Sequence, residues 1–471
     1  MRPSRVFKLI IVASLLVAAF FYIVKVTNKD EKVRTRDDEE DKGIDFAEEH
    51  KDFAEERNDI KSVIKKEDGE KKPEEDSSPQ EEAHQQNEKS VNLSDRNPSS
   101  VQEMRSIIND VNFNQEVHNL DKFPKRPEEG IIIVVQVHNR PEYLEQLVKS
   151  LGAAKSIEKA LLIISHDYFS KEINKIVESI DFCQVMQIFF PFASQFYPDE
   201  FPGQDPNDCP RDIPRDKALE IECTNAAYPD MYGHYREAPF TMTKHHWWWK
   251  AHRVFEGLKA TRDHKGLVLF LEEDHIVSQD FYPTLELMAK LQQGECPECD
   301  IISMGLYDRP SNYQSVGDMV DVITWQSSKH NMGMAYTRDT WAKIRSCSKE
   351  FCTFDDYNWD WTLQHVSGRC LPSTLTTMVI LGPRVFHIGT CGMHHSNKDA
   401  KCEVEKEVGY VEDLLRRNKP YLDPSGLYIK QRFDKSAVIK TMKPNGGWAD
   451  PRDHRLCMSY AKMQMVGQND T

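Results

Sequence analysis

Three runs of apolar residues in the middle of the chain each end in polar side chains. They span residues 131–137 (IIIVVQV), 161–167 (LLIISHD) and 267–274 (LVLFLEED). The first two runs are followed by segments with helical periodicity, EYLEQLVKSL and SKEINKIVESI. Continuous apolar strands that alternate with helices are typical of a buried parallel sheet, so the pattern predicts a mostly parallel α/β fold.

The polar ends of these runs predict a binding site, because ligands of parallel α/β sheets bind beyond the carboxyl ends of the strands. The three ends carry Gln136, His138, Asn139 and Arg140, then His166 and Asp167, then Glu272, Glu273 and Asp274. A carboxylate that directly follows a buried strand is costly unless it is paired or binds a cation. Its oxygen atoms suit Mn²⁺ or Mg²⁺ bridging a diphosphate, whereas a helix cap or a solvated loop is the structural alternative.

Two further segments concentrate aromatic residues. Residues 244–250 read KHHWWWK, and a helix would spread the three tryptophans over much of its circumference, so we expect at least one in the core. Lys244 and the two histidines could approach phosphates or a base. Residues 355–361 (DDYNWDW) combine rings that can stack on sugars with acids that can accept a hydroxyl proton. Structural packing or capping is the alternative for both segments.

The N-terminal segment differs from the rest in hydropathy. Residues 9–24 form an uncharged apolar run between Lys8 and Lys25, about 24 Å long as a helix. Basic residues before the run favour a cytosolic N-terminus, so we predict an uncleaved anchor of type II topology. A cleaved signal peptide is the alternative, although no A-x-A-like cleavage site follows Val24.

The formal net charge of −15 comes mainly from one stretch, since 22 acidic and 11 basic side chains lie between Asp30 and Glu82. This acidity argues against a nucleic-acid binder that neutralises phosphates. Residues 25–110 are too poor in apolar side chains to fold, which predicts a disordered stem with a glycosylation sequon at Asn92. The sequence thus divides into a cytosolic tail (1–8), a transmembrane anchor (9–24), an acidic lumenal stem (25–110) and a folded lumenal domain (111–471).

All 11 cysteines lie beyond residue 180, on the predicted lumenal side, where disulfides are the expected state. Cys296-Pro-Glu-Cys299 lacks a second pair at metal spacing, so we interpret it as a local disulfide rather than a zinc knuckle. The odd count leaves one thiol, and Cys183, in an apolar run, is the candidate for a buried free cysteine. Around Cys391, His387, His394 and His395 are possible metal ligands or hydrogen-bonded core histidines.

Taken together, eight segments resemble the N-acetylglucosaminyltransferase II family of the N-glycan pathway, in order over roughly residues 115–465. They are QVHNR (136–140), SHD (165–167), KHHWWWK (244–250), LEEDH (271–275), HNMG (330–333), DDYNWDW (355–361), FHIGTCGMHH (386–395) and NGGWADPRDH (445–454). The resemblance implies a GT-A fold and an inverting, Mn²⁺-dependent transfer of GlcNAc from UDP-GlcNAc. The acceptor is O2 of the α-1,6-arm mannose of an N-glycan, in a step from hybrid to complex glycans, and the location is the Golgi membrane. The rival hypotheses are the related transferase that acts first in the pathway, a non-catalytic lectin that kept the fold, and a structural, disulfide-rich ectodomain.

The resemblance also implies roles for single residues. Asp360 resembles the general base, and Asp274 and His387 resemble the metal ligands. The donor contacts of the family fall on Gln136, Val137, His138, Asn139, Arg140, Asp167, Met242, Thr243, Lys244, His245 and His246. A donor-contacting arginine of the family aligns with Ser311, with Arg309 two residues away, and Thr390 replaces an acid beside the metal motif. The implied disulfides are Cys209–Cys223, Cys296–Cys299, Cys347–Cys370, Cys352–Cys457 and Cys391–Cys402.

Overall fold

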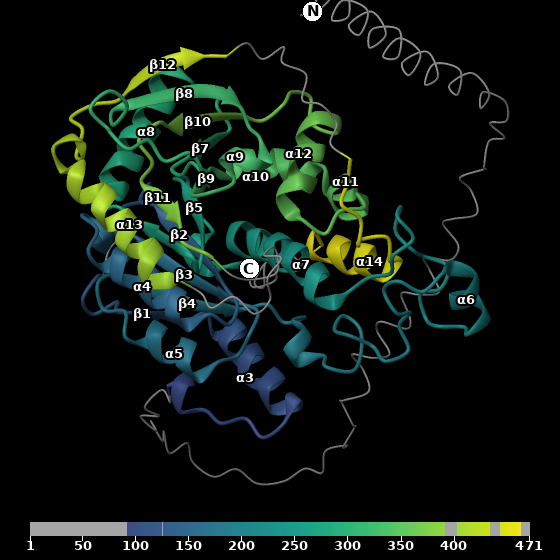
Figure 1. Ribbon diagram of the computed structural model, residues 1–471. Helices are drawn as coiled ribbons and strands as arrows, with labels where there is room; N and C mark the ends of the chain where they lie inside the picture. Colours follow the sequence, from purple (N-terminus) through teal and green to yellow (C-terminus); the bar gives the residue numbers. More distant parts are fainter. Residues whose placement is uncertain (1–91, 125, 391–402, 434–442, 463–471) are drawn as a thin grey trace, which may run out of the picture. The chain divides into compact units, whose positions relative to one another are not determined.

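A ten-stranded sheet organises the residues described by the computed structural model, which are 92–124, 126–390, 403–433 and 443–462 (Figure 1). In spatial order its strands are β1 (Val117–His118), β4 (Gln184–Phe189), β3 (Leu161–His166), β2 (Ile132–Val137), β5 (Val268–Glu272), β9 (Met334–Tyr336), β7 (Ile301–Ser303), β10 (Thr376–Ile380), β8 (Met319–Thr324) and β12 (Tyr428–Arg432). The neighbours β4, β3, β2 and β5 are parallel, and antiparallel pairs join β1 and β9 to them. The predicted α/β fold with a largely parallel sheet is therefore confirmed.

Helices cover both faces of the sheet. Successive side chains of a strand point to opposite faces, so each central strand contributes to a core on either side. Val134 of β2 belongs to one core with the three tryptophans of residues 247–249, and its neighbour Val135 belongs to a second core with Leu144 and Ile173. The longer helices are α3 (Val101–Asn114), α4 (Pro141–Gly152), α5 (Lys171–Glu178), α7 (Ala238–His252), α8 (Phe281–Glu295), α10 (Arg338–Ser346), α12 (Trp359–Arg369), α13 (Val404–Arg417) and α14 (Pro451–Tyr460). Three shorter ones are α6 (Arg215–Glu220), α9 (Ser327–His330) and α11 (Ser348–Thr353).

Helix α3 shows that the folded domain begins earlier than residue 111. Ser100 caps the helix by accepting a hydrogen bond from the Glu103 amide, and Ile108 is buried in the core. The Asn112 side chain exchanges hydrogen bonds with the backbone of Phe189 at the end of β4 (2.7 and 2.9 Å). The predicted boundary at 110/111 thus falls inside a helix. The few apolar residues at helical spacing in this helix lie within an otherwise polar segment, so the sequence did not indicate it.

The cysteines of the described residues behave as expected. The four implied disulfides present there are formed, and they are Cys209–Cys223, Cys296–Cys299, Cys347–Cys370 and Cys352–Cys457. Cys183 is free and buried, as its apolar surroundings predicted. The implied pair Cys391–Cys402, together with His394 and His395, lies outside the described residues.

The predicted tail, anchor and most of the stem also lie outside the described residues, as does Asn469-Asp-Thr, a second glycosylation sequon of the sequence. Among the residues that are described, no helix combines the length and the apolar composition that a membrane span requires. Asn92 is exposed directly before a short 3-10 turn, Leu93–Asp95.

Candidate active site

The three polar strand ends lie side by side at one edge of the sheet. Because β3, β2 and β5 are parallel and in register, Gln136 pairs with Ser165 on one side and with Glu272 on the other. The side chains that follow these positions therefore share one end of the sheet, as the sequence predicted. The ends of β2 and β3 come from neighbouring segments, whereas the end of β5 lies more than a hundred residues further along the chain and is brought to them by the sheet topology.

Asp167 links two of these strand ends to helix α7. Its Oδ1 lies 2.6 Å from Nδ1 of His138, and its Oδ2 lies 3.0 Å from Nδ1 of His246, whose other ring nitrogen contacts the Ser165 hydroxyl at 2.8 Å. Burial alone would raise the pKa of Asp167, but the two histidines lower it well below the usual range of a carboxyl. The carboxylate thus stays ionised and orients His138, whose ring is largely exposed.

Lys250 is a buried member of this site that sequence analysis missed. Its ammonium group donates to Oε1 of Gln136 at 2.8 Å, and Lys250 lies one helical turn after His246 on the same helix. Burial lowers the pKa of Lys250 to about 7, although the charges of Glu272 and Asp167 oppose that shift. The only signal in the sequence was its place as the last residue of the KHHWWWK segment.

The predicted metal ligands Asp274 and His387 are close together. Residue 274 follows β5 and residue 387 ends β11 (Val385–His387), which pairs with β6 (His275–Val277). Nε2 of His387 lies 3.3 Å from Oδ2 of Asp274, and Nη1 of Arg140 lies 3.0 Å from the same oxygen. Burial would raise the pKa of Asp274, but His387 and Arg140 lower it well below the usual range. Arg140 also binds Glu273 at 2.5 Å.

Two observations show that a cation fits between Asp274 and His387. Oδ1 of Asp274 is buried and has no hydrogen-bond partner among the described residues. Gly389 leaves the space beside the pair open, because a Cβ atom there would lie 2.5 Å from Oδ2 of Asp274 and 2.8 Å from Nε2 of His387. Glu272 and His275 extend this donor set, since each offers a ligand atom within 4.8 Å of one on Asp274.

Asp360 lies in the first turn of α12, near this acidic strand end. Its Oδ2 accepts from Nδ2 of Asn331 and its Oδ1 from the Trp361 amide, both at 2.9 Å. Burial raises the pKa of Asp360 to about 6, with a further contribution from the negative charge of Glu272. Asn331, which donates to Asp360, lines a small cavity together with Glu272 and His275, so Asp360 lies beside the acidic end of β5.

Helix α7 is buried on nearly every side, and its histidines and lysines point in different directions. All three tryptophans of residues 247–249 are at most 2% exposed, and Trp247 stacks on Trp359 with ring centroids 4.5 Å apart. His246 faces the strand ends, as described above. Lys244 instead donates to the carbonyl groups of Phe354 and Asp356 and lies over Trp448.

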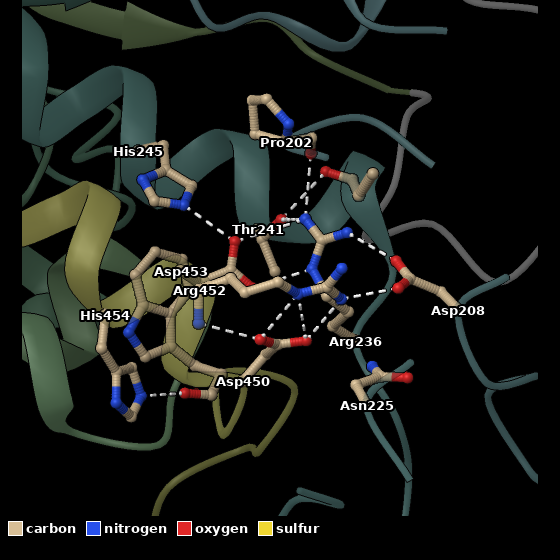
Figure 2. A network of polar contacts seen from close by, with 12 residues as sticks. Pro202, Asp208, Asn225, Arg236, Thr241, His245, Asp450, Arg452, Asp453 and His454 are labelled. Atoms are coloured by element: carbon tan, nitrogen blue, oxygen red, sulfur yellow. Dashed lines mark hydrogen bonds and ion pairs between the residues drawn. The ribbon is translucent and has the colours of Figure 1, made fainter. Parts of the chain in front are cut away.

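His245 belongs to a second network, which Figure 2 shows around Arg236. His245 lies 2.9 Å from Oδ1 of Asp453, and Arg236 binds Oδ2 of Asp453 at 2.8 Å and Oδ2 of Asp208 at 3.3 Å. Arg452 joins Asp208 to Asp450. These contacts hold α7, α14 and the segment around Asp208 together. Donor binding by Lys244 and His245 stays a prediction that their side-chain contacts do not support.

The other predicted donor residues occupy varied positions. Val137 is buried and contributes its carbonyl to the Asp167 amide, whereas Asn139 is exposed at the rim. Met242 is buried and Thr243 half-buried, one helical turn before His246. The remaining member of the predicted donor set is Ser311.

The donor-contacting arginine of the family aligned with Ser311, two residues from Arg309. Of these two residues, Arg309 is the one that approaches the predicted metal ligand His387. Arg309 donates to the carbonyl of His387 and lies 3.3 Å from Glu407. Ser311 is exposed, and its carbonyl accepts from Asn418. Thr390 accepts from the Glu403 amide at 2.9 Å, so it braces the start of α13.

A cavity of about 380 Å³ opens near the start of α7. Its lining comprises Arg211, Asp230, His234, Tyr235, Glu237, Phe240, Tyr357, Asn445 and Gly447. Asp356 does not line it. Instead its two oxygens accept hydrogen bonds from Asn358 and Asn445, which fixes the loop before α12. Within residues 355–361, Asp356 is therefore structural, whereas Asp360 faces the site.

Comparison with known proteins gives a consistent result. The family model described as N-acetylglucosaminyltransferase II (MGAT2) matches residues 105–457. The chain is 50% identical over 360 residues to the alpha-1,6-mannosyl-glycoprotein 2-beta-N-acetylglucosaminyltransferase of Rattus norvegicus. The aligned region covers 76% of this chain and 80% of the rat protein. The protein of the same name from Homo sapiens is 50% identical over 360 residues, which are 76% of this chain and 80% of the human protein. The one from Arabidopsis thaliana is 34% identical over 347 residues, which are 73% of this chain and 78% of the plant protein.

The similarity to solved structures is weaker. The crystal structure of S. aureus TarS 1-349 in complex with UDP-GlcNAc matches with 12% identity and a TM-score of 0.29, over 61% of this chain and 67% of that chain. A likeness at this level carries no argument about the site.

Proposed function

The chain belongs to the N-acetylglucosaminyltransferase II (MGAT2) family, and from this premise we propose its reaction. As a glycosyltransferase of N-glycan processing, it transfers GlcNAc from UDP-GlcNAc to O2 of the mannose on the α-1,6 arm, and the product has a β-1,2 linkage. The acceptor already carries GlcNAc on its other arm. The observation that carries the proposal is that Asp274 and His387 lie 3.3 Å apart at the carboxyl end of a parallel sheet, while Asn331 joins Asp360 to a cavity that Glu272 and His275 line.

The donor binds along the strand ends of β2, β3 and β5 in a GT-A arrangement. Asp274 and His387 hold Mn²⁺, and Glu272 and His275 are the next available ligand groups. When bound, the ion supplies Lewis-acid stabilisation of the charge that develops on the UDP leaving group. Arg140, whose guanidinium lies 3.0 Å from Asp274, adds positive charge on the same side.

Asp360 acts as the general base. Its carboxylate takes the proton from the O2 hydroxyl of mannose while that oxygen forms a bond to C1 of GlcNAc. The bond from C1 to the phosphate oxygen breaks on the opposite face, so the anomeric configuration inverts. A positioned base contributes about 10²- to 10⁴-fold to the rate. A pKa of about 6 leaves Asp360 mostly ionised at neutral pH and still basic enough to accept the proton.

The acceptor glycan approaches from the side of α12. The cavity of about 380 Å³ includes Tyr357, three residues before Asp360, and its wall mixes aromatic rings with charged side chains. Rings that stack on sugars and polar groups that bind hydroxyls suit a branched oligosaccharide. We assign this cavity to the part of the glycan beyond the reacting mannose.

The proposed location follows from residues 9–24, an apolar run between two lysines with basic residues before it. This segment anchors the chain in the Golgi membrane as a single-pass type II protein, with the folded domain in the lumen. Insertion can be checked by fusing a glycosylation reporter after residue 30. A reporter that stays unglycosylated would contradict lumenal topology.

A single assay tests the reaction. The purified chain is incubated with UDP-GlcNAc, Mn²⁺ and a defined N-glycan that carries GlcNAc on the other arm, and NMR determines the new linkage. We expect one added GlcNAc, in β-1,2 linkage on the α-1,6-arm mannose. A matched acceptor with 2-deoxymannose on that arm is the control and should give no product. Transfer to the deoxy acceptor, or no transfer to either glycan, would refute the proposal.

A further inference from the structure

Asn331 lies directly after α9 and contacts the proposed base from a different segment of the chain. Its Nδ2 donates to Oδ2 of Asp360 at 2.9 Å, while the Trp361 amide donates to Oδ1 at the same distance. Each oxygen of the carboxylate therefore carries one protein donor, which fixes the plane of the carboxyl group. The reverse orientation of the Asn331 amide would set two oxygen atoms against each other, so the observed orientation is the favourable one.

The other end of the same amide is not satisfied by the protein. Oδ1 of Asn331 is buried and has no hydrogen-bond partner among the described residues. It belongs to the wall of a cavity of about 10 Å³ that Lys250, Glu272, His275 and Trp359 also line. A buried carbonyl without a partner destabilises a fold. An apolar side chain of similar size would avoid that cost, so stability alone does not explain why an amide occupies the position.

We propose that Asn331 is the positioning residue of the reaction, because its amide N–H holds the Asp360 carboxylate toward the acceptor hydroxyl and favours its ionised form. This inference rests on the proposed function, since it takes Asp360 as the base. Asn331 acts through Asp360 and needs no contact with the reacting atoms.

The surroundings of Asp360 explain why a donor is needed there. The charges that face it are negative, from Glu272 at the end of β5 and from Asp356 in the loop before α12, and burial adds to their effect. All three raise the pKa of Asp360. The Lys250 ammonium, which lines the cavity beside Asn331, donates to Gln136. The Trp361 amide and the Asn331 amide are the groups that lower the pKa of Asp360. Loss of Asn331 should therefore protonate the base at a higher pH.

The test compares the purified wild-type chain with Asn331→Leu and Asn331→Asp, using kcat, KM for the acceptor and the pH profile of kcat/KM. For Asn331→Leu we expect kcat at pH 7 to fall by about 10- to 100-fold, the effect of one hydrogen bond to a charged group. We expect the acidic limb of kcat/KM to move up by about one pH unit. Asn331→Asp, which is isosteric but sets a second carboxylate beside Asp360, should move the limb further.

Stability and donor binding separate this role from a structural one. The melting temperature of Asn331→Leu should fall only slightly, because one hydrogen bond to a buried carboxylate is lost, and calorimetric affinity for UDP with Mn²⁺ should stay unchanged. Asn207→Ala, at an exposed asparagine, is the matched control and should change none of these quantities. A limb that stays at the wild-type pH in both variants, or a fall in melting temperature that parallels the loss of activity, would overturn the inference. An active Asp360→Asn enzyme would instead overturn the proposed function, so the two failures are distinguishable.

Discussion

Among the described residues, two clusters of buried acids and bases differ in how completely their polar atoms are paired. In the Arg236 cluster of Figure 2, the guanidinium binds two carboxylates, two carbonyl groups and one hydroxyl, and its side chain is fully buried. The second cluster lies at the strand ends and comprises Asp274, His387, Asp360 and Asn331; we call it the strand-end cluster. In it, Asp274 and Asn331 each keep a buried oxygen without a partner among the described residues. The contacts of Arg236 stabilise the fold, although Nδ2 of Asn225 in the same view has no hydrogen-bond partner in the described part of the chain. The unpaired oxygens of Asp274 and Asn331 instead belong to the proposed metal ligand and to the residue that contacts the proposed base.

The largest effect that this comparison predicts comes from the strand-end side. Asp360→Asn removes the base but keeps the shape of the side chain, so kcat should fall by about 10²- to 10⁴-fold. The melting temperature and the affinity for UDP with Mn²⁺ should stay close to those of the wild type. Steady-state kinetics and calorimetry on the same preparation provide the measurements. Full activity in the amide variant would assign the base to another residue.

The matching change on the other side is Arg236→Met. It leaves Asp208 and Asp453 buried without their main partner, so the free energy of unfolding should fall by about 3–5 kcal/mol. Chemical denaturation followed by tryptophan fluorescence measures the loss. The folded fraction at low temperature should retain the wild-type kcat, because the cluster does not contact the strand ends. If stability were unchanged and kcat fell, the division between the two clusters would be wrong.

Asp274→Asn should affect metal-dependent binding before it affects the fold. The change removes a negative ligand, and even residues that only support metal ligands are worth about 10- to 100-fold in affinity. We therefore expect the UDP affinity measured with Mn²⁺ to fall by at least that range. The weak affinity measured in the presence of a chelator should stay the same in both proteins. Equal Mn²⁺-dependent affinities would remove Asp274 from the metal site.

The two clusters should also respond to acid at different pH values. The pKa of Asp360 is raised to about 6, so kcat/KM should fall below about pH 6 as the base takes up a proton. Asp453 shows the opposite shift: burial would raise its pKa, but Arg236 and His245 lower it to about 2. Its stabilising contribution is present above the ordinary carboxyl pKa of about 4 and is lost as the pH falls toward about 2, an effect of about 2 kcal/mol.

A pH titration of both activity and unfolding free energy separates these events. Activity should be lost while the protein is still folded, and the acid loss of stability should be smaller in Asp453→Asn than in the wild type. Coincident loss of activity and structure near pH 6 would mean that the acidic limb reports unfolding rather than the base.

Local sequence patterns were sufficient to predict the sheet edge. The runs that became β2, β3 and β5 each begin with at least four consecutive apolar residues, and their polar ends, such as Asp167 and Asp274, had to meet because parallel strands share one edge. The pairing of Asp274 with His387 came only from the resemblance. Nothing in the local pattern places a residue of β11 beside one that follows β5.

The rest of the site depends on contacts between distant segments. Lys250 and Lys244 belong to one motif, yet the helix turns Lys250 toward Gln136 and Lys244 toward Asp356. The sequence gives no direction for either side chain, because a helix that is buried all round has no polar face. The contact of Asn331 with Asp360 could not be predicted for a related reason. The two residues are 29 positions apart, and Asp360 lies in helix α12.

The buried thiol of Cys183 can be used to follow opening of the folded domain. Burial raises the pKa of this thiol to about 12, and Cys183 is the only free cysteine among the described residues. An alkylating reagent can reach the sulfur only when the strands around it separate. The rate of thiol labelling therefore reports how often the domain opens, without any engineered probe.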